Sequence, residues 1–512
     1  AFLSSIRLKE ITFQDDSELQ VIGEQSFSDS TIISIKIPKT VKEIKKKAFL
    51  RCYKLKSFEF LDGCQIQCIS NDMLSNTSIK TIVIPDSVKY IDQSAFYNCS
   101  NLQNVDISED SNLNKIDYIS FSDCPINKFH IPPLFRSFRN NSLSTTITEI
   151  TISPKNSYFS VIEGKIIVCN SDISNEIFDT ILYAVRTISN KITIPSYIKK
   201  IDQKAFRHCD KLHEVEFSEN SELEIIGKHS FESCGLYKID IPDHVKIIDD
   251  FAFCNCKSLK EIKFTENSEL EIIGQRIISG SLIDSFLVPK SVKTLRSNSL
   301  YYNYGDSKNA VIEFSKDSLL QNIGEYAFMY YMNKSLVIPK HVREISDNAF
   351  NCCIYLEYVT FPEDSELQII KDDAFVCTKL CSINFPSQLK ELGQYWANNT
   401  RYLTSISISE NNQHFGYIDD KMIGYKSNPN DAHYDTIVFA LRDIEHAIIP
   451  SFIKRINPYA FYFCRNLTLI VFSENSELEI IDDYAFAETN ITKMKIPKSV
   501  KIIGNNAFYY SP

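Results

Sequence analysis

The chain has little glycine, one tryptophan and five methionines: 13 glycines are spread over 512 residues. Flexible linkers are rich in glycine and serine, and no such stretch interrupts the chain, so the sequence gives no sign of a boundary between domains. No apolar run reaches the roughly eighteen residues that a membrane span needs, so membrane insertion by this segment is not expected. The formal net charge of −10 gives no basic face for nucleic acid.

Sequence motifs of catalysis and cofactor binding are also missing. The sequence contains no HExxH, GxGxxG, P-loop or GxSxG motif. Its nine histidines are scattered, and no histidine accompanies the closely spaced cysteines in a pattern typical of zinc. We therefore expect no enzyme activity, no cofactor and no metal site.

What the sequence does contain is repetition. The decapeptide FSENSELEII occurs at residues 217–226 and again at 472–481, and FTENSELEII occupies 264–273. A second phrase, IPKSVKIIGNNAF at 496–508, has a close copy in IPKTVKEIKKKAF at 37–49. A catalytic site is needed once, so repeats on this scale indicate an architecture built from copies of one unit.

Both phrases follow the same lead-in, in which apolar residues alternate with variable ones, as in LHEVEF at 212–217. The last apolar residue of each lead-in marks one repeat. Most markers are 23 or 24 residues apart, and two gaps of 42 and 41 residues indicate insertions. The twenty markers are residues 13, 37, 60, 84, 107, 131, 152, 194, 217, 241, 264, 288, 314, 338, 361, 385, 408, 449, 472 and 496.

The alternation predicts one strand per repeat, and strands separated by one full turn of chain must run parallel. The predicted fold is a repeat solenoid: a right-handed, leucine-rich-repeat-like parallel β solenoid of about twenty 23/24-residue coils, each with a short second strand or 3₁₀ turn. It covers 1–512 as a single continuous array. A repeated phenylalanine is predicted to stack from coil to coil inside, at Phe49, Phe96, Phe206, Phe231, Phe253, Phe328, Phe350, Phe375, Phe461 and Phe486.

Charge alternates between the two kinds of turn. Acidic turns carry glutamates such as Glu219, Glu266 and Glu269, and the neighbouring proline turns carry Lys or Arg. Stacked alternately, they place acid beside base and avoid a ladder of like charges, and each exposed pair contributes about 0–1 kcal/mol. The other interpretation is a cation site, because Asp, Asn, Ser and Glu oxygens suit calcium.

The repeat LxxIxIPxxVxxIxxxAFxxC resembles the BspA-type leucine-rich repeat of bacterial surface proteins and of protists such as trichomonads. The resemblance covers essentially the whole chain. It implies surface display, adhesion to host matrix or to other cells, and protein recognition, and it implies no catalytic residues. Pro or Ser-Glu follows the strand where the usual leucine-rich hallmark has Asn or Cys, so the curvature of receptor-type repeats is not expected.

The two insertions, 153–191 and 409–446, match each other in sequence. Two alternating apolar runs around a polar loop predict a β-hairpin in each. Both carry an arginine at the matched position, Arg186 and Arg442. It is expected to cap backbone carbonyls or pair with a carboxylate, and a ligand role stays open.

Eight of the fifteen cysteines lie three residues after the repeating phenylalanine position. This regularity predicts a ladder of small buried side chains with free thiols. Disulfides between neighbouring coils stay open, for example among Cys209, Cys234 and Cys256.

Outward strand positions, such as Glu59, Val83 and Leu287, vary in residue type. This variation is compatible with a recognition surface and also with the freedom of a solvated face. A local excess of tyrosine is the candidate partner-binding site, because tyrosine combines apolar area with a polar tip. Its residues are Tyr301, Tyr302, Tyr304, Tyr330, Tyr331 and Tyr358.

Two functions fit these features. The first is a non-enzymatic recognition or adhesion module of a cell-surface or secreted protein, binding host, matrix or cell-surface macromolecules. The second is an intracellular, cytoplasmic scaffold for protein complexes. Seven Asn-x-Ser/Thr sequons would allow glycosylation in the first case. Since the sequence starts and stops within a repeat, we expect a segment of a longer protein.

Overall fold

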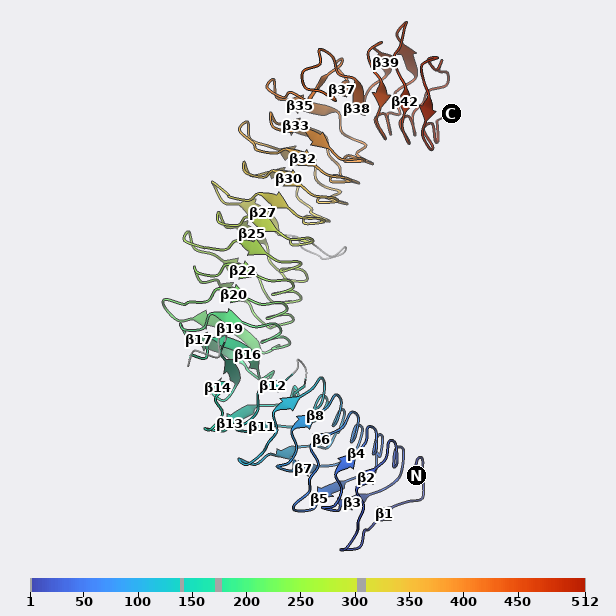
Figure 1. The fold of residues 1–512 in the computed structure, drawn as a ribbon. Helices are drawn as coiled ribbons and strands as arrows, with labels where there is room; N and C mark the ends of the chain where they lie inside the picture. Colours follow the sequence, from blue (N-terminus) through green and yellow to red (C-terminus); the bar gives the residue numbers. More distant parts are fainter. Residues whose placement is uncertain (1, 139–141, 171–176, 302–309, 512) are drawn as a thin grey trace. The chain divides into compact units, whose positions relative to one another are not determined.

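The computed structural model describes residues 2–138, 142–170, 177–301 and 310–511. It consists of two compact units, Ala1–Tyr237 and Lys238–Pro512. Within each unit the chain winds through successive coils that carry short strands (Figure 1). The described residues form only strands, turns and irregular segments, without a helix. The leucine-rich-repeat-like parallel β solenoid predicted from the sequence is confirmed.

The longer strands form what we call the first ladder. Each ends at a marker of the repeat or one or two residues before it, and neighbours within a sheet pair in parallel, as β3 does with β5. In the first unit these strands are β1 (Glu10–Ile11), β3 (Ser34–Ile37), β5 (Ser57–Phe60), β7 (Thr81–Val83), β9 (Asn104–Asp106), β11 (Lys128–Ile131), β13 (Glu149–Ile152), β17 (Asn190–Ile194) and β19 (Leu212–Phe217).

The first ladder of the second unit has the same form. Its strands are β21 (Lys238–Asp240), β23 (Glu261–Lys263), β25 (Ser285–Val288), β27 (Val311–Phe314), β29 (Ser335–Val337), β31 (Tyr358–Thr360), β33 (Ser382–Phe385), β35 (Ser405–Ile408), β39 (His446–Ile449) and β41 (Leu469–Phe472). The strand expected at the last marker, Ile496, is not formed, and that segment is irregular.

Two-residue strands form a second ladder in each unit. In the first unit they are β2 (Val21–Ile22), β4 (Glu43–Ile44), β6 (Cys68–Ile69), β8 (Tyr90–Ile91), β10 (Lys115–Ile116), β12 (Ser137–Phe138), β18 (Lys200–Ile201) and β20 (Ile225–Ile226). In the second they are β22 (Ile247–Ile248), β24 (Ile272–Ile273), β26 (Thr294–Leu295), β28 (Asn322–Ile323), β30 (Glu344–Ile345), β32 (Ile369–Ile370), β34 (Glu391–Leu392), β40 (Arg455–Ile456), β42 (Ile480–Ile481) and β43 (Ile502–Ile503).

The predicted hairpins are present in both insertions. In the first unit β14 (Phe159–Ile162) and β15 (Ile166–Cys169) pair antiparallel, and β15 also pairs antiparallel with β16 (Thr180–Ala184). The second unit repeats this arrangement with β36 (Phe415–Tyr417), β37 (Met422–Tyr425) and β38 (Thr436–Ala440). The third strand of each group pairs in parallel with the next strand of the second ladder, so each insertion rejoins the solenoid.

The alternation of the lead-in decides which side chains face the core. In β3, Ile35 and Ile37 are buried while Lys36 between them is exposed. The in-register pairing places Ile35 beside Phe58 of the next coil. Strand after strand, the apolar positions therefore bury one row of side chains and leave the intervening row for solvent or a partner.

The repeated phenylalanines stack within each unit as predicted. The rings of Phe206 and Phe231 lie 5.0 Å apart with planes inclined by 1°, and those of Phe350 and Phe375 lie 5.0 Å apart at 3°. All four side chains are fully buried. The stack is a ladder of side chains whose spacing follows the spacing of the coils, about 4.8 Å.

The segment around the stacked ring differs from the predicted 3₁₀ turn. The N–H groups of Lys47, Phe49 and Arg51 donate to carbonyls of the next coil at 2.9, 2.9 and 2.8 Å, whereas those of Ala48 and Leu50 donate back within their own turn. Lys47 and Arg51 adopt left-handed φ values of 61° and 58°. A 3₁₀ helix would direct every N–H along its own chain, so the left-handed residues turn alternate donors toward the neighbouring coil.

The cysteine ladder is buried, and all fifteen cysteines have free thiols. Ladder thiols find acceptors in the preceding coil: the Sγ atoms of Cys52, Cys99 and Cys353 donate to carbonyl oxygens at 2.9, 3.1 and 3.1 Å. A small side chain with a weak donor fits this position because it satisfies a buried carbonyl without needing space.

Replacing Phe350 with Ala is expected to destabilise the protein by about 3–5 kcal/mol, because it removes a ring stacked on both sides and leaves a cavity. Glu269→Ala is the control: its exposed pair with His244, 3.2 Å apart, contributes under about 1 kcal/mol. Denaturant unfolding measures both. A larger loss for Glu269→Ala would show that the acidic turn, rather than the ring stack, holds the coils together.

Ile119 has a β-branched side chain at a left-handed φ of 50°. Such a conformation costs an L-residue about 1–2 kcal/mol, and asparagine tolerates it better. Ile119→Asn is therefore expected to raise the free energy of unfolding by about 0.5–1 kcal/mol, as measured by denaturant unfolding. Ile119→Val, which keeps the branch, should give no gain; an equal gain would mean that backbone strain is not the cause.

Candidate binding surfaces

The outward face of the first ladder carries a group of exposed apolar side chains in the second unit. They lie on four consecutive strands, β25, β27, β29 and β31. Leu287, Val311, Val337 and Tyr358 are 49%, 42%, 64% and 47% exposed. Isolated apolar side chains on a protein surface are ordinary, but a group on neighbouring strands is typical of an interaction site.

A groove of about 900 Å³ opens beside this group, between β27 and β29. It is lined by residues of both strands, including Val311, Glu313, Ser335 and Val337. β27 pairs with β25, and β29 pairs with β31, but β27 and β29 belong to separate sheets. The groove therefore lies where the first ladder is interrupted.

Tyr331 lies at this groove and departs from the regular ladder. It follows Phe328 by three residues, so it occupies the position that cysteine holds in the neighbouring coil at Cys353. Its ring is 1% exposed and packs edge-on against Phe328 with 5.7 Å between ring centroids. The side chain lines the groove, and its hydroxyl accepts a hydrogen bond of 3.0 Å from Nδ2 of Asn333. A tyrosine in place of a cysteine needs more room between coils than the regular ladder provides.

Charged side chains border the groove. Lys340 Nζ lies 2.7 Å from an oxygen of Asp364, and both residues line the groove. This hydrogen bond holds the pKa of Asp364 below its ordinary value and raises the pKa of Lys340. The pair is exposed and so contributes little stability, but it gives an apolar surface a polar rim.

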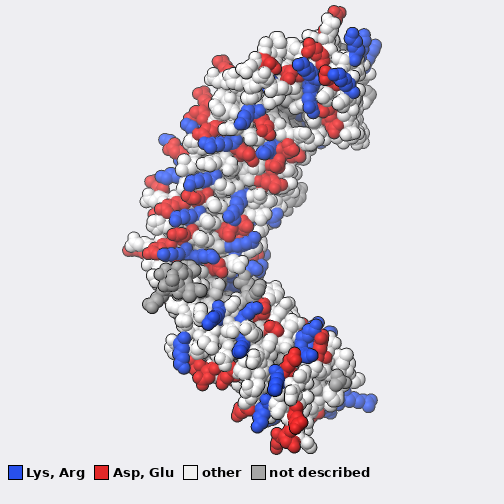
Figure 2. Space-filling model, in the orientation of Figure 1, with Lys and Arg blue, Asp and Glu red and all other residues white. Residues whose placement is uncertain are grey.

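Ion pairs between neighbouring coils are frequent in both units, and rows of acidic and basic side chains alternate across the face shown in Figure 2. Glu271 pairs with Lys293 at 2.9 Å, and Glu479 pairs with Lys501 at 2.7 Å. Acid and base are therefore matched between coils, but in these pairs through Glu271 and Glu479. Within the described ranges the predicted Glu219, Glu266 and Glu474 form no ion pair.

The predicted tyrosine site divides into different environments. Tyr358 is exposed on β31, whereas Tyr331 is buried, so Tyr331 is a core side chain that reaches the groove only through its hydroxyl. Tyr301 is half-buried, with the Arg276 guanidinium 4.2 Å above its ring, and its ring lies 6.0 Å from that of Tyr330. Tyr302 and Tyr304 lie outside the described residues.

A second tyrosine cluster was not predicted. The ring centroids of Tyr395 and Tyr459 lie 4.7 Å apart, those of Tyr459 and Tyr484 lie 4.9 Å apart, and Tyr459 also meets Tyr462 at 4.9 Å. The second insertion separates Tyr395 from Tyr459 in sequence. The sequence does carry a signal for this contact, because Tyr459 and Tyr484 each lie two residues before a repeated phenylalanine and so occupy the same position in consecutive coils. Both residues adopt a left-handed φ.

Asp373 lies close to this cluster. Burial and, to a lesser extent, the charges of Asp372 and Asp347 together raise the pKa of its carboxyl to about 6. Its charge in turn raises the pKa of Tyr459, where burial is the main cause. The cluster therefore combines aromatic surface with a carboxylate that is destabilised in its charged form.

The matched arginines of the insertions cap carbonyls, which is one of the two structural roles expected from the sequence. In the first unit, Nη1 of Arg186 donates to the carbonyl of Ala205 at 2.8 Å. In the second unit, Nη1 of Arg442 donates to the carbonyls of Ala440 and Ala460 at 3.3 and 3.2 Å. Each arginine thus joins its insertion to the next coil.

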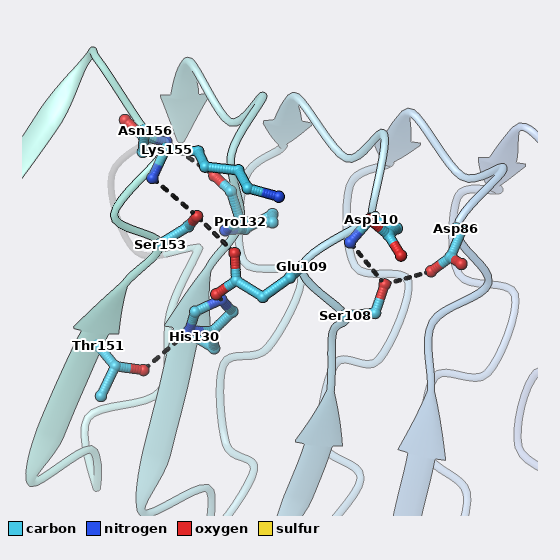
Figure 3. Close-up of polar contacts among 10 residues, drawn as sticks. All are labelled: Asp86, Ser108, Glu109, Asp110, His130, Pro132, Thr151, Ser153, Lys155 and Asn156. Carbon is cyan, nitrogen blue, oxygen red and sulfur yellow. Dashed lines mark hydrogen bonds and ion pairs between the residues drawn. The ribbon is translucent and has the colours of Figure 1, made fainter.

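A polar network ties three coils together in the first unit (Figure 3). Nδ1 of His130 lies 2.9 Å from Oγ1 of Thr151, and its Nε2 lies 3.3 Å from the Glu109 carboxylate. The other oxygen of Glu109 accepts a hydrogen bond of 2.6 Å from Ser153 Oγ, which in turn accepts the Lys155 N–H at 3.2 Å. The order carboxylate, imidazole, hydroxyl is that of a nucleophilic triad. Here it links the turns after β9 and β13 across β11.

Among the residues that the structure covers, no group of three or more His, Cys, Asp or Glu side chains is placed to hold a metal ion. Over the same ranges no helix is long and apolar enough to cross a membrane.

These features define a leucine-rich-repeat solenoid. The model of the BspA type leucine rich repeat region matches residues 1–102, 67–180, 175–306, 307–422 and 432–512. The chain belongs to this family. None of the curated proteins matches it in sequence.

The chain is similar to the pneumococcal vaccine antigen PcpA, with 17% identity, a TM-score of 0.45, and coverage of 77% of this chain and 85% of that one. It is also similar to a leucine rich cell surface protein from Faecalibacterium prausnitzii, with 18% identity, a TM-score of 0.39, and coverage of 67% and 83%.

Asp373→Asn is expected to stabilise the protein at neutral pH. The folded state raises the pKa of this carboxyl from 3.8 to about 6, so it binds the proton more tightly than the unfolded chain does. Stability therefore falls as the pH rises from 3.8 to about 6. The gain in stability from Asp373→Asn should vanish below pH 3.8. Denaturant unfolding across the pH range measures the difference.

Asp364→Asn is the control for Asp373→Asn, because the Lys340 hydrogen bond lowers the Asp364 pKa. The Asp364 carboxylate therefore affects stability in the opposite direction. It stabilises the folded state at pH values above its ordinary pKa, and this stabilisation is lost as pH falls. The substitution should be slightly destabilising at neutral pH. If both variants responded alike to pH, local burial at Asp373 would not be the cause.

Proposed function

We propose that the chain is a non-enzymatic recognition module that binds a protein partner through the outward face of β25, β27, β29 and β31. The observation that carries this proposal is the group of four exposed apolar side chains beside the groove. Hydrophobic groups with a polar rim are typical of protein interfaces, and their central aromatic and aliphatic residues supply most of the binding energy. Membership of the BspA type repeat family is consistent with this role.

The setting that we propose is adhesion by a cell-surface or secreted protein, with a host, matrix or cell-surface macromolecule as partner. An intracellular scaffold is the alternative. Asn466 and Asn490 are exposed sequon residues, so they are accessible to glycosylation in a secreted protein. Glycopeptide mapping of the native protein distinguishes the two settings: occupied sites support the surface role, and unmodified sites with cytosolic recovery support the scaffold.

Val337→Glu is expected to weaken binding to cells or immobilised matrix proteins about thirtyfold, which corresponds to about 2 kcal/mol. A charge at the centre of an apolar interface must be desolvated without a partner. Binding of the labelled, purified chain measures the effect. The matched control is Ile448→Glu, because Ile448 on β39 is 65% exposed and Val337 is 64% exposed.

Equal losses in Val337→Glu and Ile448→Glu would place the contact elsewhere or indicate a general charge effect. Full binding by Val337→Glu would remove this face as the site. Failure of the unmodified chain to bind any cell or matrix surface would contradict the adhesion role itself.

A further inference from the structure

Cys352 and Cys377 occupy the same position in two consecutive coils of the second unit. Each follows a stacked ring by two residues, Phe350 in one coil and Phe375 in the next. Both cysteines adopt the left-handed backbone conformation, with φ values of 57° and 58°. Since their backbones have the same local conformation, their side chains leave the two coils in the same direction.

Backbone hydrogen bonds hold the two positions in register. The N–H of Phe350 donates to the carbonyl of Ala374 at 2.8 Å, and the N–H of Cys352 donates to that of Val376 at 3.0 Å. The stacked rings of Phe350 and Phe375 lie 5.0 Å apart. Cys352 thus lies directly over Cys377 at the coil spacing of about 4.8 Å, which falls in the range of Cα separations, about 4.4–6.8 Å, that disulfides span.

Side chains at this position touch in other pairs of consecutive coils. In the first unit, Arg51 lies 3.5 Å from Asp29, and Nδ2 of Asn98 donates to Oδ1 of Asn76 at 2.7 Å. In the second unit, Nδ2 of Asn399 lies 3.2 Å from Sγ of Cys377 itself. The position therefore brings neighbouring side chains within contact distance regardless of residue type, and in the 352/377 pair both are thiols.

These two thiols differ from the core cysteines in accessibility. Cys352 and Cys377 are partly exposed. The adjacent Cys353 is fully buried, and its thiol donates to the carbonyl of Phe328. Burial raises the pKa of Cys352, and the neighbouring Cys377 raises it further, which agrees with direct contact between the two side chains. A small reagent can reach this pair without opening the core.

We propose that Cys352 and Cys377 are a disulfide-forming site that joins the two coils carrying β31 and β33. With a small-molecule disulfide such as oxidised glutathione, the thiolate of one cysteine attacks a sulfur of the reagent. A mixed disulfide forms and one glutathione thiolate leaves. The second cysteine then attacks the protein sulfur of the mixed disulfide and releases the other thiolate. Two cysteines are oxidised, one glutathione disulfide is reduced to two thiols, and the two cysteine protons pass to the departing thiolates.

The bond would close the segment from 352 to 377, which contains Tyr358 on β31. A cross-link restricts the unfolded chain more than the folded one, so it would suppress local opening of these two coils. The proposal is independent of the partner, because it concerns only the chemistry of the thiol pair.

The test uses the unmodified chain. The folded protein is equilibrated with oxidised glutathione, the remaining thiols are alkylated, and the digest is analysed by mass spectrometry without reduction. The expected result is one cross-linked peptide joining Cys352 to Cys377, still formed in Cys353→Ser. In hydrogen exchange, the amides of these coils should exchange at least about tenfold more slowly after oxidation, while those of distant coils do not change.

Cys352→Ser should abolish the cross-link and leave a stable glutathione adduct on Cys377. Adducts on both cysteines of the unmodified chain without a cross-link would overturn the proposal. So would a cross-link through Cys353, or complete absence of reaction at both positions. Because the peptide map is made on the unmodified chain, a variant that fails to fold does not affect the decision.

Discussion

The fold of each unit depends on the hydrogen bonds that the turn around the repeated phenylalanine donates to the next coil. In the turn at Phe49, three alternate N–H groups cross to the neighbouring coil. This turn needs two residues in the left-handed conformation, each of which costs about 1–2 kcal/mol. The three hydrogen bonds stabilise the folded state by about 0.5–1.5 kcal/mol each. These contributions nearly cancel. Burial of the ring contributes about 1.5–3 kcal/mol more and therefore makes the turn stable. The hydrogen bonds between coils and the stack of rings thus depend on each other.

The same turn explains the buried cysteines and the thiol pair. A cysteine such as Cys353 adds a second donor to a carbonyl of the preceding turn, that of Phe328, which also accepts the N–H of Tyr331. The second left-handed position points its side chain along the surface, over its neighbour. One backbone pattern thus produces an inner ladder of buried thiols and an outer position at which side chains of neighbouring coils meet, as at Asp29 with Arg51 and Asn76 with Asn98.

Candidate sites arise where the repeat is broken. Tyr331 replaces a ladder cysteine, and the groove opens where β27 and β29 belong to different sheets. The second insertion brings Tyr395 against Tyr459. Alternating charges on the regular coils keep the remaining surface solvated and add little stability, since exposed pairs are weak.

The sequence by itself determined the solenoid, the parallel first ladder, both hairpins and the stacked rings, because each follows from a local pattern of apolar residues. It left the role of the matched arginines open between carbonyl capping and pairing with a carboxylate. It could not determine the left-handed turn in place of a 3₁₀ turn, since that choice depends on carbonyls in the next coil. It placed Tyr331 among surface candidates, but burial depends on its cysteine-like position within the stack. Tertiary structure alone decided which thiols meet and which tyrosines cluster, because contacts between coils depend on register and inserted length rather than on neighbours in sequence.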